Sequence, residues 1–141
     1  MIKNGFLLII AGLLSSINSF SQNQVNDSIE LKLNKCLDDS ISTSGMCNCT
    51  IQAMNSWDKE LNKSYNLLMK SLGQPNKEFL KSAQKEWILY RDKEFELINK
   101  IYYTELQGTM YYPMAWNNKL EIVKKRALEL KDYFELIKEN K

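Results

Sequence analysis

The side chains best suited to covalent chemistry are three cysteines, Cys36, Cys47 and Cys49. Cys47 and Cys49 fall within one expected helix, where a separation of two residues turns their side chains about 160° apart. Cys49 shares a helix face with the apolar side chains of Met46 and Ala53. We therefore predict a disulfide between Cys36 and Cys49, with Cys36 to Cys47 as the alternative pairing. Either pairing leaves one thiol over, and that thiol could link two chains.

Few residues are suited to catalysis or to metal binding. The chain contains no histidine, which is the usual general base near neutral pH and the commonest metal ligand. Cys47 and Cys49 alone are too few ligands for a zinc site. Asp58 and Glu94 could in principle act as acid and base on a glycoside, but acidic residues on long helices are usually solvated, and no nucleophile motif or phosphate loop accompanies them. We therefore expect no enzyme activity, no metal and no cofactor.

Residues 108–116 have the composition of a binding surface. This segment concentrates methionine and aromatic residues between two expected helices. Rigid amphipathic rings bury area at low entropic cost, which suits recognition of a partner. The alternative is that the segment folds back as a plug over one end of the molecule. The expected binding residues are Gly108, Thr109, Met110, Tyr111, Tyr112 and Trp116.

A set of polar residues lies beside the apolar stripes of the expected helices. Its members are Asp58, Asn62, Gln84, Arg91 and Arg126. An arginine next to a buried stripe either extends to water or is held by acceptors on a neighbouring helix. We expect a structural role, in which Arg91 or Arg126 forms charge-assisted hydrogen bonds that fix the helix register. The expected acceptors are Asp58, Asn62, Gln84 and Glu94.

These residues are positioned by helices, because apolar side chains recur at spacings of three and four along most of the chain. The pattern predicts a short helix over residues 29–37 and long helices over residues 44–72, 76–106 and 114–139. Short connections favour antiparallel neighbours. We predict one all-α domain over residues 22–141, an antiparallel bundle of three long helices with a short N-terminal helix packed across one end. The expected buried stripe of the third helix is Leu80, Ala83, Trp87, Tyr90, Glu94, Leu97, Ile98 and Ile101.

Residues 1–21 have the features of a signal peptide. Lys3 is followed by an apolar run over residues 6–14, and the small residues Ser19 and Ser21 predict cleavage before Gln22. The apolar run is shorter than the roughly 20 residues that span a bilayer. We therefore expect a secreted or periplasmic protein without a membrane anchor, in a compartment where disulfides form. A net charge of +2 is too small for nucleic-acid binding to be expected.

Four segments together resemble the lysozyme inhibitor LprI-like N-terminal domain family, a group of small helical proteins of the bacterial envelope. They are residues 42–46 (Ser-Thr-Ser-Gly-Met) followed by Cys49, residues 57–65 (Trp-Asp-Lys-Glu-Leu-Asn-Lys-Ser-Tyr), residues 83–92 with Ala-Gln-Lys-Glu-Trp and Tyr-Arg-Asp, and residues 108–110 (Gly-Thr-Met) followed by Arg126 and Leu130. The resemblance covers nearly the whole chain after the expected signal peptide. It implies a helical fold outside the cytoplasm.

The resemblance also implies a function and a difference. Members of this family resemble inhibitors of lysozyme. The resemblance therefore implies a binding protein that covers the cleft of a lysozyme or another envelope protein by steric, non-catalytic association. The alternative is an interaction scaffold of the cell envelope that does not inhibit lysozyme. The family commonly has a second cysteine pair where this chain has Phe95 and, by its spacing from Arg126, about Asn118. The resemblance therefore implies that one disulfide is lost and that the bond between Cys36 and Cys49 is kept. The sequence leaves the oligomeric state open.

Overall fold

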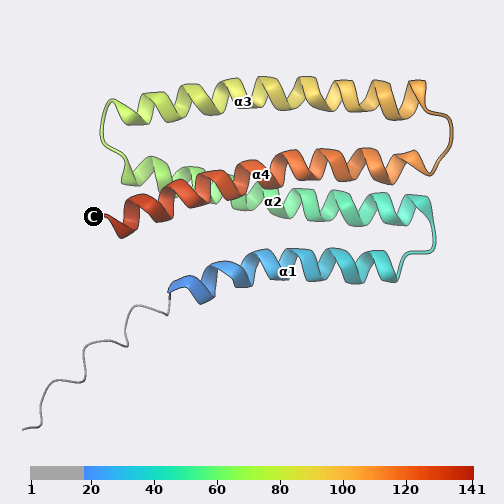
Figure 1. Ribbon diagram of the computed structural model, residues 1–141, viewed down its shortest axis with the longest axis horizontal. Coiled ribbons are helices and arrows are strands. Elements are labelled where there is room, and N and C mark those ends of the chain that lie inside the picture. The colour runs from blue at the N-terminus through green and yellow to red at the C-terminus, as the bar shows by residue number, and fades with distance from the viewer. Residues whose placement is uncertain (1–17) are drawn as a thin grey trace, which may run out of the picture.

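The computed structural model describes residues 18–141, and this range is entirely helical apart from short connections (Figure 1). The helices are α1 (Asn18–Asp38), α2 (Thr43–Ser71), α3 (Asn76–Asn99), the π-helical segment η1 (Lys100–Glu105) and α4 (Tyr111–Glu139). The predicted all-α class is therefore confirmed for these residues. The first 17 residues of the predicted signal peptide lie outside the described range. None of the helices within that range is long and apolar enough to cross a membrane.

The first helix is longer than expected and is placed differently. α1 has 21 residues and runs alongside α2 in the opposite direction (Figure 1), whereas we predicted a short helix packed across one end. The polar residues before Ile29 do not end the helix, because no glycine or proline interrupts residues 18–38. Val25, Ile29 and Leu33 recur at a spacing of four and pack against the core. A continuous stripe of this kind favours contact along the length of α2.

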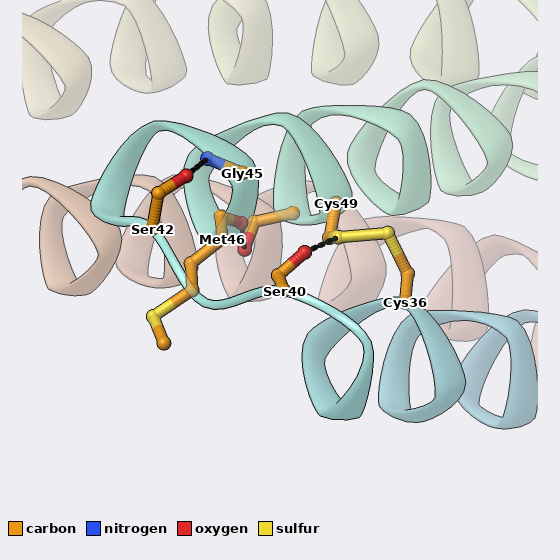
Figure 2. Close-up of a disulfide and its surroundings, with 7 residues drawn as sticks. Cys36, Ser40, Ser42, Gly45, Met46 and Cys49 are labelled. Atoms are coloured by element: carbon orange, nitrogen blue, oxygen red, sulfur yellow. Dashed lines mark hydrogen bonds between the residues drawn. A yellow bond between two sulfur atoms is a disulfide. The ribbon is translucent and has the colours of Figure 1, made fainter.

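A disulfide and a helix cap hold the connection between α1 and α2 (Figure 2). Cys36 and Cys49 are joined, with their Cα atoms 5.7 Å apart. The hydroxyl of Ser40 lies 3.3 Å from the Cys49 sulfur. Ser42 caps α2, because its Oγ accepts a hydrogen bond of 3.0 Å from the backbone N–H of Gly45. The cap and the disulfide together determine where α2 begins and which helix lies beside it.

The core lies between α2 and α4. Their apolar stripes face each other, and the largest fully buried side chains are Trp57, Leu120 and Leu130. Burying a leucine side chain completely stabilises the fold by about 1.5–3 kcal/mol. The Trp57 indole N–H donates to Glu30 of α1 over 3.3 Å, and Glu30 also pairs with Lys124 of α4 at 2.9 Å. One carboxylate therefore connects α1, α2 and α4.

The third long helix contributes much less to the core than we predicted. α3 packs on α4, and only Leu80 and Ile98 of α3 are buried. Tyr90 is 53% exposed and Leu97 is 51% exposed, so both were wrongly assigned to a buried stripe. A stripe is covered only when neighbouring helices lie along its whole width, and α3 lies at the edge of the structure (Figure 1). The sequence pattern shows an amphipathic face but not the number of its neighbours.

The helix predicted over residues 76–106 is also interrupted. It changes from α-helical to π-helical geometry at Lys100, and the π-helical segment η1 continues to Glu105. The last helix then begins at Tyr111, three residues earlier than expected, after a connection in which Gly108 adopts a φ of 127°. Only glycine adopts this backbone conformation without strain. The connection is therefore shorter than the loop expected from the sequence.

Candidate functional site

A cleft of about 800 Å³ lies where α2 begins and where η1 leads into α4. The first turn of α2 contributes Ser42, Thr43 and Ser44, followed by Cys47 one turn later. The other wall comes from Tyr103 of η1 and from the start of α4, where the lining residues are Thr109, Tyr112 and Trp116. Two segments more than 50 residues apart in the sequence therefore form one site that combines aromatic rings, hydroxyls and a thiol.

The aromatic wall is ordered by contacts between its rings. Tyr103 and Tyr112 meet edge to face, with centroids 5.1 Å apart and an interplanar angle of 87°. This arrangement is favourable because the positive edge of one ring meets the negative face of the other. Trp116 follows Tyr112 by one helical turn, so that both lie on the same side of α4. About two fifths of Tyr112 remains exposed, at 41%, which leaves ring surface free to contact a ligand.

A buried lysine lies behind this wall. Lys119 is only 5% exposed, and its Nζ lies 4.3 Å from the Trp116 ring centroid and 5.4 Å from that of Tyr103. Its ammonium group donates to Oδ1 of Asn99 over 2.5 Å, and burial lowers the pKa of this group. Among the side chains that the structure describes, no carboxylate pairs with it. The rings of the cleft therefore lie against a positive charge that no anion of the described chain compensates.

The first turn of α2 adds a second source of positive potential. The N-terminus of a helix carries unpaired backbone N–H groups and the positive end of the helix dipole. The side chain of Ser42 accepts from the N–H of Gly45 and its backbone carbonyl accepts from the N–H of Met46, and no acidic residue lies in the first turn. Since Ser42, Thr43 and Ser44 all line the cleft, this end of the helix adds to its positive potential.

The thiol in the cleft is a weak nucleophile at neutral pH. Cys47 is free, and burial raises its pKa, so that the protonated thiol predominates. The pKa of Tyr103 is raised as well, by burial first and then by the neighbouring Cys47 and Tyr112. The described residues contain no cluster of three or more cysteines or acidic residues that could hold a metal ion. The groups of this cleft are better suited to binding a ligand than to transforming it.

The predicted binding residues divide between the cleft and its outer edge. Thr109, Tyr112 and Trp116 line the cleft, whereas Met110 protrudes from the connection with 67% of its surface exposed. Gly108 forms the bend, and Tyr111 is half-buried in the first turn of α4. The sequence prediction missed Tyr103 and the start of α2. The position of Cys47, away from the face that carries Cys49, was a signal that this part of α2 faces a different neighbour.

The predicted polar residues do not form one network. Arg126 of α4 donates to Gln84 of α3 over 3.1 Å and pairs with Glu129 at 2.6 Å. Arg91 instead pairs with the adjacent Asp92 at 2.7 Å and lies 5.5 Å from the Trp87 ring centroid.

The two remaining residues of the set bond to each other within α2, where Nδ2 of Asn62 donates a hydrogen bond to Oδ2 of Asp58 over 3.1 Å. Of the two arginines expected as alternatives, Arg126 reaches an acceptor on another helix, whereas Arg91 pairs with the adjacent Asp92 on α3, at the edge of the bundle. Of the predicted set, only Gln84 and Arg126 join two helices.

Phe95 and Asn118 stand where the resemblance implies a second cysteine pair. They lie where α3, η1 and α4 approach one another. The Phe95 ring centroid is 5.8 Å from Nζ of Lys119, and Asn118 donates through Nδ2 to the hydroxyl of Tyr102 over 2.8 Å. Noncovalent contacts therefore connect the segments here. They also hold η1, and with it Tyr103, against α4.

Comparison with known proteins places the chain among uncharacterized relatives. The family model of lysozyme inhibitor LprI matches residues 34–130. An uncharacterized protein of Rhizobium meliloti is 34% identical over 101 residues, which cover 62% of this chain and 70% of that protein. A crystal structure of an uncharacterized protein from Burkholderia thailandensis matches with a TM-score of 0.71 at 30% identity, covering 77% of this chain and 54% of the other. The chain thus spans about half the length of that solved protein.

Proposed function

The chain belongs to the lysozyme inhibitor LprI family, and from this premise we propose that it is a secreted or periplasmic protein that binds a lysozyme and blocks it sterically, without turnover and without a cofactor. The disulfide between Cys36 and Cys49 supports an oxidising compartment, because such bonds persist outside the cytoplasm. The surface that makes the contact is the end of the bundle at which α4 begins.

One observation carries this assignment: exposed apolar side chains and uncompensated positive potential occur at the same end of the molecule. Met110 and Met114 protrude there beside Tyr112, and the N-terminus of α2 and the buried Lys119 lie close by. Glycosidases of the lysozyme type act through two carboxyl groups that flank the scissile bond. A surface that is apolar and positive at its centre is complementary to a cleft of that kind.

A titration against purified lysozyme tests the proposal. We expect a complex of one inhibitor with one lysozyme and a matching loss of muramidase activity. The double variant Met110→Ala, Tyr112→Ala is expected to weaken inhibition about tenfold or more, because exposed Met and Tyr anchors carry much of the energy of such interfaces. Phe79→Ala is the matched control, since Phe79 is equally apolar and exposed but lies at the start of α3, at the other end of the bundle.

Two results would contradict the proposal. One is the absence of both complex and inhibition at micromolar concentrations of the wild-type chain. The other is equal loss of inhibition in the double variant and in Phe79→Ala, because the contact surface would then not be the end at which α4 begins. Circular dichroism of each variant separates lost contact from lost fold.

The exposed face of α3 supports a second candidate, an interaction scaffold of the envelope that does not inhibit lysozyme. Tyr90 and Leu97 of α3 recur at a spacing of seven, Ile101 follows in η1, and all three are exposed, so a second protein could cover them. This function predicts that muramidase activity is unchanged in the titration. It also predicts that Tyr90→Asp and Leu97→Asp disrupt binding to an envelope protein, whereas Met110→Ala does not.

A further inference from the structure

The proposed steric inhibition is carried by side chains that protrude around the cleft, and it does not say what fills the concave space of the cleft itself. Its volume of about 800 Å³ lies within the roughly 300–1,000 Å³ that is typical of small-molecule sites. Its walls carry no lysine, arginine, aspartate or glutamate. A ligand that fills it must therefore be recognised by rings, hydroxyls and backbone groups, with the charge of the surroundings acting from a distance.

The rings and hydroxyls favour a sugar. The C–H bonds on one face of a pyranose ring carry partial positive charge and pack against the negative face of an aromatic ring. The rings of Tyr112 and Trp116 line the cleft along one side of α4. The hydroxyls of Ser42, Ser44 and Thr109 line the same space, and each can both donate to and accept from the hydroxyls of a sugar.

The surrounding charges favour an acidic sugar over a neutral one. The buried Lys119 ammonium lies behind the aromatic wall, against the rings of Trp116 and Tyr103. It has no carboxylate partner among the described side chains. The opposite wall is the N-terminus of α2, which has no acidic residue in its first turn. A single carboxylate between these walls would be stabilised by both.

We propose that this cleft binds an acidic pyranose sugar, with the ring face of the sugar on Tyr112 and Trp116 and its carboxylate directed to the first turn of α2. This binding does not depend on inhibition of lysozyme. Because Tyr112 belongs both to the cleft and to the proposed inhibitory surface, a bound sugar and a lysozyme would compete for this end of the molecule.

Isothermal titration calorimetry with matched disaccharides and no lysozyme tests the proposal on the full chain. The acidic probe is N-acetylglucosaminyl-N-acetylmuramic acid. The neutral probe is diacetylchitobiose, which has the same two rings and acetamido groups but lacks the lactyl carboxylate. We expect the acidic probe to bind about tenfold more tightly at low salt, and the difference to shrink in about 0.5 M salt as the charges are screened.

A third probe distinguishes two sources of acidic sugar. A disaccharide containing glucuronate carries its carboxylate on the ring instead of on a lactyl group. If it binds as tightly as the muramic-acid probe, the site recognises acidic pyranoses in general, and if it binds much more weakly, the site selects cell-wall sugars. Both results support the proposal. Failure of both acidic probes to bind at about 10 mM, or equal affinity for the acidic and neutral probes, would overturn it.

Two variants separate the roles of stacking and charge. Tyr112→Ala is expected to lower the affinity for acidic and neutral probes alike about fivefold or more, whereas Tyr133→Ala, a similarly exposed tyrosine near the other end of α4, should change neither. Lys119→Met keeps most of the length of the side chain and removes its charge, so the preference for the acidic probe should fall while binding of the neutral probe is kept.

The proposal is wrong if Tyr112→Ala and Tyr133→Ala behave alike. It is equally wrong if Lys119→Met folds and keeps the full preference for the acidic probe, because the buried charge would then not act on the ligand. Since no lysozyme is present in this experiment, its failure would leave the proposed inhibition to be judged by its own titration.

Discussion

Two arginines of the same predicted set differ in what they hold together. Arg126 joins α4 to α3 through Gln84, and its guanidinium carbon lies 5.9 Å from the Trp87 ring centroid. Arg91 contacts only groups of its own helix. A charge-assisted hydrogen bond between two helices contributes more to folding than an ion pair of adjacent, exposed residues.

We therefore predict that Arg126→Ala lowers the free energy of unfolding by about 1–3 kcal/mol, and that Arg91→Ala lowers it by about 1 kcal/mol or less. Urea unfolding followed by circular dichroism measures both values. Gln84→Ala is the companion variant, because it removes the acceptor while leaving the arginine in place. A cost for Arg91→Ala equal to that for Arg126→Ala would mean that Arg91 also reaches another helix.

At the scale of single residues the sequence could predict Gln84 as an acceptor for an arginine on another helix and part of the lining of the cleft, but not the rest of that lining. Gln84 and Arg126 were in the predicted polar set, and Thr109, Tyr112 and Trp116 were in the predicted binding segment. The residues that face Thr109, Tyr112 and Trp116 across the cleft were not predictable, because Tyr103 and the first turn of α2 reach the cleft only through the way the helices pack. Pairing across helices depends on their arrangement, whereas periodicity within one helix is local.

Among the elements, α1 depends most on a single covalent bond. It lies against α2, and the bond between Cys36 and Cys49 closes the connection with a sequence separation of 13 residues. By the entropic account a closed loop of this length restricts the unfolded chain and stabilises the fold by about 3 kcal/mol. Much of the attachment of α1 therefore comes from the disulfide.

The double variant Cys36→Ser, Cys49→Ser is expected to lower the free energy of unfolding by about 2–3 kcal/mol. The amides of α1 should lose protection from hydrogen exchange before those of α2 do. Cys47→Ser is the matched control and should change stability little, because the thiol of Cys47 is in no disulfide. A similar loss in Cys47→Ser would indicate that Cys47 competes for the bond in solution.

The bounds of the elements were predictable to different degrees. α2 begins and ends within one residue of the predicted range 44–72, because Ser42 caps its start and the helix-disfavouring residues Gly73 and Pro75 follow its end. α1 begins at Asn18 without such a signal, whereas the sequence pattern predicted a helix only from residue 29 and residues 18–21 were assigned to the signal peptide. The change to π-helical geometry at Lys100 has no marker in the local sequence, since it depends on the packing of η1 against α4.

The molecule as a whole consists of a tight pair of helices with two less buried helices beside it. α2 and α4 supply most of the buried apolar side chains, and α3 supplies only Leu80 and Ile98. We expected three long helices to bury their apolar seams against one another, since all three have an amphipathic pattern of similar length. An amphipathic pattern does not specify how many helices cover it, so the unequal roles of the three could not be read from it.

This unequal packing predicts that the molecule opens in steps. Local stability follows the number of buried apolar contacts. Amides of α2 and α4 should therefore exchange only through global unfolding, whereas amides of α3 should exchange through a partial opening that has a lower free energy. Native-state hydrogen exchange at increasing, sub-denaturing urea concentrations measures both classes. A single class, in which α3 exchanges together with α2 and α4, would contradict the prediction.

Two matched core variants decide whether the partial opening belongs to α3. Ile98→Ala removes a buried side chain of α3 and should lower protection in α3 and η1 without lowering it equally in α2. Leu130→Ala removes a fully buried side chain from the interface of α2 and α4 and should lower protection throughout by about 2–5 kcal/mol. Because η1 carries Tyr103, the same opening would move one wall of the cleft, and a sugar bound there should raise the protection of α3 and η1 selectively.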